Sequence, residues 1–240
     1  MRLDLYLYEN GLAHSRSFAK SLILNGKVFV SGKTVTKPSF EVLEDMEVTV
    51  VTEEIYVSRG AYKLEGAVRV FKIELLGRSC IDVGASSGGF TDYLLKNGAR
   101  RVIAVDSGSG QLAESLRQNG CVTVFENYNA RYMKREDFEY VPDLAVMDVS
   151  FISATYIIPA LYEVLESGSD FICLIKPQFE VGRENVGKGG IVKDEKIRLS
   201  AVKKVTEFAK SVGFTCIATI KSPISGGDGN IEYLAHFIKN

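Results

Sequence analysis

Apolar residues along most of this chain follow two alternating patterns. From residue 58 onward, short continuous apolar runs alternate with longer stretches in which apolar residues recur every three or four positions. The short runs predict buried strands, and the periodic stretches predict helices. Strands that alternate with helices form a doubly wound sheet, so the pattern predicts an α/β domain over residues 58–240. The expected strands cover residues 80–83, 101–106, 122–126, 144–148, 170–176, 215–221 and 231–238, and the expected helices cover residues 61–71, 90–95, 112–117, 155–166 and 195–212.

Residues 1–57 follow a different pattern, which predicts a small α+β domain. Residues 2–10 fit either a strand or a helix, because their leucines alternate along the chain and also share a helical face. An acidic pair, Glu53 and Glu54, precedes the expected domain boundary near Val57. The other expected elements are a helix over residues 16–25 capped by Ser15, a hairpin that turns at Ser31 and Gly32, and a strand over residues 46–51.

A glycine-rich turn connects the strand at 80–83 to the next helix, in the segment DVGASSGGFTD. Glycine permits positive φ and lets a ligand approach the backbone, and the start of a helix offers unpaired N–H groups to polar or anionic groups. We therefore expect a ligand at this turn. A tight turn between packed elements is the alternative for Ser86 and Ser87.

Asp106 ends the following strand, about 20 residues after the turn, where a carboxylate can accept hydrogen bonds from both hydroxyls of a ribose. NAD and S-adenosylmethionine both contain such a ribose. The spacing G-x-x-x-G-G differs from the G-x-G-x-x-G of dinucleotide-binding folds. The turn is more similar to the one that holds the methionine carboxylate in Rossmann-like methyltransferases.

Three further polar residues stand at predicted strand ends, where open α/β sheets bind their ligands. The amide of Asn127 can donate and accept hydrogen bonds, as the edge of an adenine requires, although an ordinary loop asparagine is equally compatible. Asp148 and Lys176 end the fourth and fifth strands. The candidate cofactor-binding residues are Asp82, Gly84, Ala85, Ser86, Gly88, Gly89, Phe90, Asp106, Asn127 and Asp148.

Basic and acidic residues nearly balance over the whole chain but are unevenly distributed along it. The chain has 29 basic and 30 acidic residues, so its net charge gives no argument for nucleic acid. Residues 1–40, however, contain six basic residues against two acidic ones, and residues 41–54 contain acidic residues as their only charged ones. Cations that act together bind phosphate backbones, whereas isolated charges on a helix are usually only solvated.

Cysteine, histidine and apolar content exclude several classes of protein. The four cysteines lie far apart without a CxxC pair, and His14 and His236 are too few and too distant for a zinc site. We expect buried free thiols in a reducing cytosol and no metal. No apolar run approaches the ~18 residues of a membrane span, so we expect a cytoplasmic protein without a membrane partner.

The first part of the chain resembles the S4 RNA-binding module over SRSFAKSLILNGKVFVSGKTV. In that family a basic helix and a hairpin form one surface that faces phosphates. The resemblance implies RNA-binding roles for Arg16, Lys20, Lys27 and Lys33, to which we add Arg59 at the start of the next domain.

Four further features resemble the TlyA or haemolysin A-like ribosomal RNA 2′-O-methyltransferases: SRGAYKL, DVGASSGGFTD, MDVSFIS with LIKPQFE, and GNIEYL. The resemblance covers nearly the whole chain. It implies an S4 domain over residues 1–57 and an FtsJ-like, S-adenosylmethionine-dependent domain over residues 58–240. That domain has a mostly parallel seven-stranded sheet with one antiparallel strand, and its implied substrate is cytidine ribose in ribosomal RNA or ribosomal subunits.

The same resemblance implies a catalytic set of Lys63, Asp148, Lys176 and Glu232. An antiparallel last strand would begin at the edge where the fourth and fifth strands end, so the set can converge. Lys176 is the candidate that contacts the ribose hydroxyl, either as a base or as a charged donor. In the helix at 61–71 we expect Tyr62, Leu64, Val68 and Phe71 to pack inward, with Lys63 beside this stripe.

One departure and two alternative functions stand beside this interpretation. The family's second-strand segment often carries a tyrosine where this chain has Ser109, within DSGSGQL. A membrane-active, haemolysin-like protein is one alternative, and an RNA-binding factor without catalysis is the other.

We also expect glycine-rich loops at 187–190 and 226–229 to close over cofactor and nucleotide. The oligomeric state, monomer or dimer, stays open.

Overall fold

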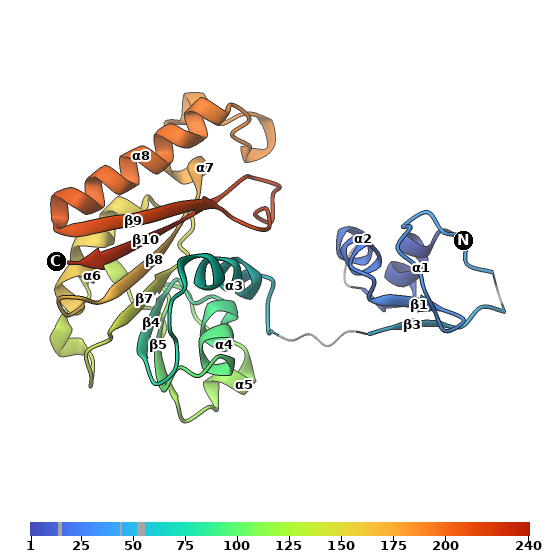
Figure 1. The fold of residues 1–240 in the computed structure, drawn as a ribbon, viewed down its shortest axis with the longest axis horizontal. Coiled ribbons are helices and arrows are strands. Elements are labelled where there is room, and N and C mark those ends of the chain that lie inside the picture. Colours follow the sequence, from blue (N-terminus) through green and yellow to red (C-terminus); the bar gives the residue numbers. More distant parts are fainter. Residues whose placement is uncertain (14–15, 44, 52–55) are drawn as a thin grey trace. The chain divides into compact units, whose positions relative to one another are not determined.

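The structure is a computed structural model that describes residues 1–13, 16–43, 45–51 and 56–240 (Figure 1). It forms two compact units, Met1–Ile55 and Tyr56–Asn240. The expected helix cap Ser15 and the acidic pair Glu53 and Glu54 lie outside the described residues.

The N-terminal unit packs two helices against a three-stranded antiparallel sheet of strand order β2-β1-β3. Residues 2–10 form a helix, because Leu3 and Leu7 are both fully buried one turn apart. The predicted hairpin is confirmed: Ser31 and Gly32 have φ of 49° and 75°, as a tight two-residue turn requires. The elements are α1 Leu3–Glu9, α2 Arg16–Leu24, β1 Val28–Val30, β2 Lys33–Thr34 and β3 Val48–Val50.

The C-terminal unit contains a seven-stranded sheet of order β6-β5-β4-β7-β8-β10-β9. Strand β10 pairs antiparallel with both β8 and β9, and the remaining pairs are parallel, so the predicted topology is confirmed. The strands are β4 Ser79–Val83, β5 Arg101–Val105, β6 Val122–Phe125, β7 Leu144–Met147, β8 Asp170–Ile175, β9 Phe214–Lys221 and β10 Tyr233–Lys239.

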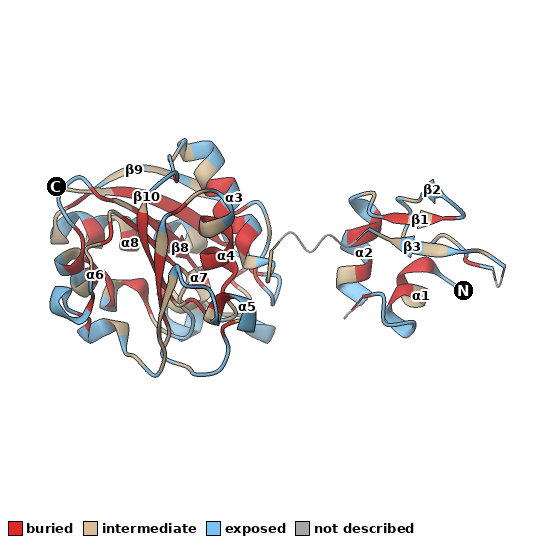
Figure 2. Cartoon of the chain, turned by 90° about the horizontal axis from the view of Figure 1, so that it is seen from below, coloured by how far each residue is buried: buried red, intermediate tan, exposed pale blue. Residues whose placement is uncertain are grey.

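Helices cover both faces of this sheet (Figure 1). Helices α3 and α4 pack through residues such as Leu64 and Leu94 on one face, and α6 and α8 pack through residues such as Leu161 and Val205 on the other. The central strands are accordingly buried on both sides (Figure 2). The helices are α3 Gly60–Phe71, α4 Gly89–Lys96, α5 Glu114–Arg117, α6 Ile158–Val164, α7 Pro177–Glu180 and α8 Glu195–Val212. Short 3-10 turns are η1 Ala130–Tyr132, η2 Arg135–Asp137, η3 Ala154–Tyr156, η4 Arg183–Asn185 and η5 Lys188–Gly190.

Helix α3 is rotated relative to the prediction from its large apolar residues. Tyr62, expected inside, is 37% exposed, whereas Lys63 is only 8% exposed. The buried face is formed mainly by small residues, and Gly66 lies so close to Pro223 that an added Cβ would be 2.6 Å from its Cγ. Small side chains allow this close packing, and the resulting rotation carries Lys63 inward.

The predicted helix over residues 155–166 is divided into η3 and α6. Pro159 stands in the first turn of α6, where its missing N–H costs nothing and its fixed φ suits the start of a helix. The helix therefore begins at Ile158 rather than continuing from the turn before it.

Candidate active site

The glycine-rich turn after β4 lies at the carboxyl edge of the sheet and needs glycine at two positions. Gly84 and Gly88 have φ of 86° and 95°. A Cβ on Gly84 would lie 2.3 Å from the backbone oxygen of Asp148, and one on Gly88 would lie 2.3 Å from the Cδ1 of Leu116. The turn is thus packed directly against the end of β7 and against α5.

Two adjoining cavities open at this edge, and Gly84, Ser86, Asp148 and Ser150 line both. The first has a volume of about 330 Å³ and the second about 560 Å³. The first cavity is also lined by Ser58, Arg59, Lys63, Ala85, Gly89, Phe90, Lys176 and Ser225. The second is also lined by Asp106, Gly108, Gln111, Tyr128, Asn129, Arg131 and Phe151.

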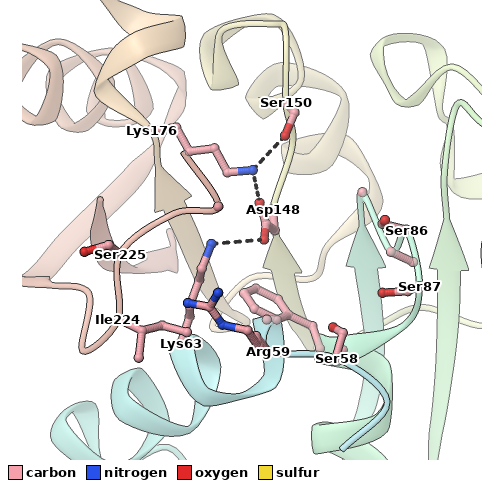
Figure 3. A pocket seen from close by; sticks show the side chains of 16 residues that line it. Ser58, Arg59, Lys63, Ser86, Ser87, Asp148, Ser150, Lys176, Ile224 and Ser225 are labelled. Atoms are coloured by element: carbon pink, nitrogen blue, oxygen red, sulfur yellow. Dashed lines mark hydrogen bonds and ion pairs between the residues drawn. The ribbon is translucent and has the colours of Figure 1, made fainter. Parts of the chain in front are cut away.

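Four charged side chains form a continuous chain beside the first cavity. Lys176 Nζ lies 2.5 Å from Asp148 Oδ1 and donates a hydrogen bond to Ser150 Oγ at 2.7 Å. Lys63 Nζ lies 4.0 Å from Asp148 Oδ2 and 2.7 Å from Glu232 Oε2. Figure 3 shows the ammonium groups of Lys63 and Lys176 both directed at Asp148. Each cation therefore has a carboxylate partner.

The fold explains how these four distant residues meet. Asp148 and Lys176 directly follow β7 and β8, which are parallel neighbours. Glu232 directly precedes β10, and because β10 runs antiparallel to β8, its start lies at the same edge. Lys63 reaches the edge from α3. The structure thus brings together the whole predicted catalytic set.

Asp82 lies fully buried at the end of β4, beneath the turn. Its Oδ2 accepts hydrogen bonds from Thr91 N at 2.9 Å and Thr91 Oγ1 at 2.7 Å. Its Oδ1 has no hydrogen-bond partner among the described residues. Burial raises the pKa of Asp82 from 3.8 to about 7, and nearby Asp148 acts in the same direction.

This raised pKa predicts a pH-dependent stability. Between its ordinary pKa of 3.8 and the folded-state pKa of about 7, Asp82 loses its proton more readily in the unfolded chain. Stability therefore falls as the pH rises through this window.

Asp82→Asn can accept both hydrogen bonds from Thr91 without a charge. We expect wild type to lose roughly 3 kcal/mol of unfolding free energy relative to Asp82→Asn between about pH 4 and about pH 7. Urea titrations of both proteins across this range provide the measurement, and parallel pH profiles would contradict the assignment.

Asp106 joins the second cavity to the turn. Its Oδ2 accepts a hydrogen bond from Ser86 N and its Oδ1 accepts one from Gly108 N, each at 2.7 Å. A carboxylate offers about four acceptor sites, so two remain for a ligand. Gln111 accepts a hydrogen bond from Ser86 Oγ at 3.1 Å and closes the same corner.

Asn127 does not line either cavity. It is exposed, has a φ of 53°, and its backbone N–H donates to Gly108 O. The chain turns there, so the cavity wall is formed by the next residues, Tyr128 to Arg131. Ser109, which replaces the family's tyrosine, is also exposed and outside the cavity lining.

Phe151 is a site residue that the strand and helix pattern did not identify. It is 92% exposed, lines the second cavity and has a φ of 64°. Its ring centroid lies 5.2 Å from that of Phe179. A positive φ is costly for a bulky residue and is often found at functional sites. The available signal was a large apolar residue in the segment VSFIS, which follows a strand end and belongs to no predicted strand or helix.

Of the two glycine-rich loops, only the later one reaches a cavity, where Ile224, Ser225 and Gly227 line the first. The buried side chain of Asn230 ties the loops together. Its Oδ1 accepts from Val192 N at 3.0 Å and its Nδ2 donates to Gly190 O at 2.9 Å.

The candidate RNA-binding residues fall into three situations. Arg16 in the N-terminal unit bonds to the buried Asp4 at 3.0 Å, and together with Arg2, the stronger partner, it lowers the pKa of Asp4 to about 2. Arg59 lines the first cavity of the C-terminal unit. The exposed side chains of Lys20, Lys27 and Lys33 make no ion pair within the part of the chain that is described.

Composition also led to expectations about metal binding, cysteines and membrane spans, on which the described residues bear. These residues contain no group of His, Cys, Asp and Glu suited to a metal ion. The four cysteines are free, and Cys80 and Cys173 are buried as expected, whereas Cys216 is half-buried and Cys121, which lies in a turn, is exposed. No helix among the residues that the structure covers is long and apolar enough to cross a membrane.

Comparisons with known proteins cover almost the whole chain. Residues 56–239 match the model of the FtsJ-like methyltransferase family, and residues 1–48 match that of the S4 domain. The chain is 46% identical to the putative rRNA methyltransferase YqxC of Bacillus subtilis, over 98% of this chain and 84% of that protein. It is 45% identical to the 16S/23S rRNA (cytidine-2′-O)-methyltransferase TlyA of Mycobacterium tuberculosis, over 97% of this chain and 87% of that protein.

Solved structures agree with this assignment. A putative hemolysin from Streptococcus thermophilus is similar at a TM-score of 0.77 and 43% identity, over 100% of this chain and 88% of that one. A putative S-adenosylmethionine dependent methyltransferase from Listeria monocytogenes shares the fold at a TM-score of 0.56 and 14% identity, over 76% of this chain and 100% of that one. The chain therefore belongs to the FtsJ-like methyltransferase family and carries an S4 domain before its methyltransferase domain.

Proposed function

We propose that this protein transfers a methyl group from S-adenosylmethionine to the 2′-oxygen of a cytidine ribose in ribosomal RNA. The observation that carries the proposal is the chain of ion pairs from Lys176 through Asp148 and Lys63 to Glu232, beside a cavity that adjoins the glycine-rich turn. The relative from Mycobacterium tuberculosis bears the name of this activity.

The residues around the turn fit the cofactor. Asp106 has acceptor sites left for the ribose hydroxyls, and the start of α4 at Gly89 offers N–H groups to a carboxylate. The unpaired Oδ1 of buried Asp82 lies beneath the same turn. A side chain at Gly84 would collide with Asp148. When bound, S-adenosylmethionine supplies an electrophilic methyl group on a sulfonium sulfur.

Cofactor binding through Asp106 has a direct test. Asp106→Ala removes the ribose acceptor and releases the backbone N–H groups of Ser86 and Gly108. We expect the affinity for S-adenosylmethionine, measured by calorimetry, to fall at least about tenfold, because a hydrogen bond to a charged group contributes about 1.5–3 kcal/mol. The control is Asp45→Ala, which changes an exposed acid in the N-terminal unit. Unchanged binding by Asp106→Ala would exclude this cofactor site.

The catalytic set acts by holding the ribose hydroxyl, whose proton passes to Lys176 where this lysine is neutral and to solvent where it is a charged donor. Such a hydroxyl is a poor nucleophile, so the enzyme must orient it for in-line attack and remove its proton during or after the attack. Lys176 borders the cavity, and Asp148 and Ser150 fix its Nζ. An ammonium group has three donors, so one stays available for the hydroxyl. The pair Lys63 and Glu232 holds Asp148 in place from the other side.

Phe151 is placed to receive the base of the target nucleotide. Its ring is almost entirely exposed and stands at the second cavity, three residues after Asp148. Bases released from a strand stack on aromatic side chains in many RNA-binding proteins. We therefore assign Phe151 the role of a stacking surface beside the catalytic set.

The S4 domain supplies affinity for RNA through the exposed lysines Lys20, Lys27 and Lys33. The triple variant Lys20→Glu, Lys27→Glu and Lys33→Glu is expected to weaken binding to ribosomal RNA by at least about tenfold at low salt. The slope of log affinity against log salt should also become smaller in magnitude by about 2, because fewer counterions are released on binding when fewer phosphates are contacted. Filter binding across a salt series measures both quantities.

The matched control for the triple variant changes three exposed lysines of α8: Lys196→Glu, Lys203→Glu and Lys210→Glu. It alters the net charge equally on a different surface. An equal loss of affinity in both variants would mean that only overall charge matters, which would contradict a binding surface on the S4 domain.

A further inference from the structure

A buried carboxylate, Glu180, ties together the two loops that carry Asp148 and Lys176. Glu180 is 7% exposed and lines neither cavity. Its Oε1 accepts a hydrogen bond from Ala154 N at 2.7 Å, and its Oε2 accepts one from Ser153 Oγ at 2.5 Å. Both donors belong to the loop that leads from β7 into η3.

Glu180 reaches that loop from the other catalytic segment. It ends α7, the short helix that begins directly after Lys176. Its neighbour Phe179 contacts Phe151 ring to ring. Residues 148–154 and residues 176–180 are thus joined at their catalytic ends by Lys176 and at their far ends by Glu180.

Helix α8 anchors the carboxylate in turn. Lys204 Nζ donates to the backbone oxygen of Glu180 at 2.7 Å and lies 3.2 Å from its Oε2. A buried carboxylate is stable only when it is paired and hydrogen-bonded, and Glu180 has all of these partners. The tie therefore rests on a long helix rather than on another loop.

The loop that Glu180 holds has a strained backbone at Phe151, the residue assigned to stack on the target base. Phe151 has a φ of 64°, a conformation that persists only when its surroundings enforce it. The hydrogen bonds to Ser153 and Ala154 fix the chain two and three residues later. Exposed Phe151 itself has little other packing, apart from the ring of Phe179.

We propose that Glu180 is a positioning residue for methyl transfer: it fixes the loop of residues 148–154 so that Ser150 and Phe151 present the target nucleotide to Lys176. This inference rests on the proposed function. The cofactor residues Asp106 and Gln111 follow β5, on the other side of β4, and their hydrogen bonds do not involve Glu180, although residues 148–152 of the loop line the second cavity with them. Loss of the hydrogen bonds from Glu180 should therefore reduce RNA turnover more than cofactor affinity.

Two variants of Glu180 separate positioning from general stability. Glu180→Ala removes both hydrogen bonds to the loop. Glu180→Gln can keep them, because its amide oxygen accepts from Ala154 N and its amide nitrogen donates to Ser153 Oγ. We expect Glu180→Ala to lower kcat/KM for ribosomal RNA by about tenfold or more, and Glu180→Gln to recover to within about threefold of wild type. The Kd for S-adenosylmethionine should change by a smaller factor than kcat/KM in both variants.

The control for stability is Phe214→Leu, which removes buried aromatic volume where β9 begins, at the opposite edge of the sheet, and changes no hydrogen-bond partner of Glu180. Hydrogen exchange at the amide of Ala154 reports the tie without any methyl transfer, and we expect faster exchange in Glu180→Ala only. A Glu180→Ala enzyme with faster exchange and full kcat/KM would overturn the positioning role. Equal losses of kcat/KM in Glu180→Ala and Phe214→Leu would also overturn it, since both losses would then follow stability. A wild-type protein that transfers no methyl would instead overturn the proposed function and this inference with it.

Discussion

Lys176→Ala is expected to lower kcat for methyl transfer to ribosomal RNA by about a thousandfold, within the range of a lost proton-transfer or orienting group. Lys176 is the cation that Asp148 and Ser150 hold at the first cavity. Its removal leaves the hydroxyl unoriented and Asp148 with a weaker set of partners. Initial rates with saturating S-adenosylmethionine and ribosomal RNA give the measurement.

Two companion variants sharpen this experiment. Lys176→Arg keeps a charged donor that cannot act as a base at neutral pH, so substantial activity in it would identify an orienting donor, and loss of activity would favour a base. Lys203→Ala changes an exposed lysine of α8 and should leave kcat unchanged. Full activity in Lys176→Ala would remove Lys176 from the catalytic set without touching the fold.

Phe151→Ala is expected to reduce kcat/KM for ribosomal RNA by roughly tenfold to a hundredfold, because stacking of one base on an aromatic ring contributes about 1–3 kcal/mol. The side chain is 92% exposed, so the fold should be retained. Phe151→Trp should keep most of the activity, since it offers a larger ring. Steady-state kinetics with RNA as the varied substrate measure the effect.

The matched control is Leu199→Ala, which removes an exposed apolar side chain from α8, where it is 49% exposed. It should leave RNA kinetics unchanged. If Phe151→Ala also behaved like wild type, the base would have to be held elsewhere in the site, and the strained backbone at residue 151 would need another explanation.

The sheet could be predicted from the sequence because its strands are buried on both faces. Strand β7 is buried at each of its positions, so it appears in the sequence as a continuous apolar run. Helix α8 was predicted with the bounds that the structure has, because it carries a regular apolar stripe and ends at Gly213. The antiparallel position of β10 came from the family resemblance, since hydrophobic pattern alone does not set strand order.

The points at which the structure differs from the expected pattern also have physical causes. Tyr62 was expected inside α3, but helix packing there depends on the small residues Ala61, Gly66 and Ala67, which a pattern of large apolar residues does not weigh. The predicted role of Asn127 depends on where the chain turns after β6. Asn127 has a positive φ at this turn and lies outside the cavity lining, which in this segment begins at Tyr128, so its contact with an adenine stays a prediction.

The catalytic set shows the same limit. Sequence and resemblance named its four members, but the order of the ion pairs depends on side-chain positions that no local pattern encodes. Glu180 is a further example. It stands within a motif that was noted for Lys176, and only the structure shows that its carboxylate reaches back to Ser153 and Ala154.

The most direct test of the central claim is tritium transfer from methyl-labelled S-adenosylmethionine to ribosomal subunits and to naked ribosomal RNA, followed by nuclease digestion to locate the label. We predict label on the ribose 2′-oxygen of a cytidine, and none with the Lys176→Ala variant. Label on a base, or no transfer by a folded protein that binds RNA, would contradict the account. The second result would leave an RNA-binding factor without catalysis.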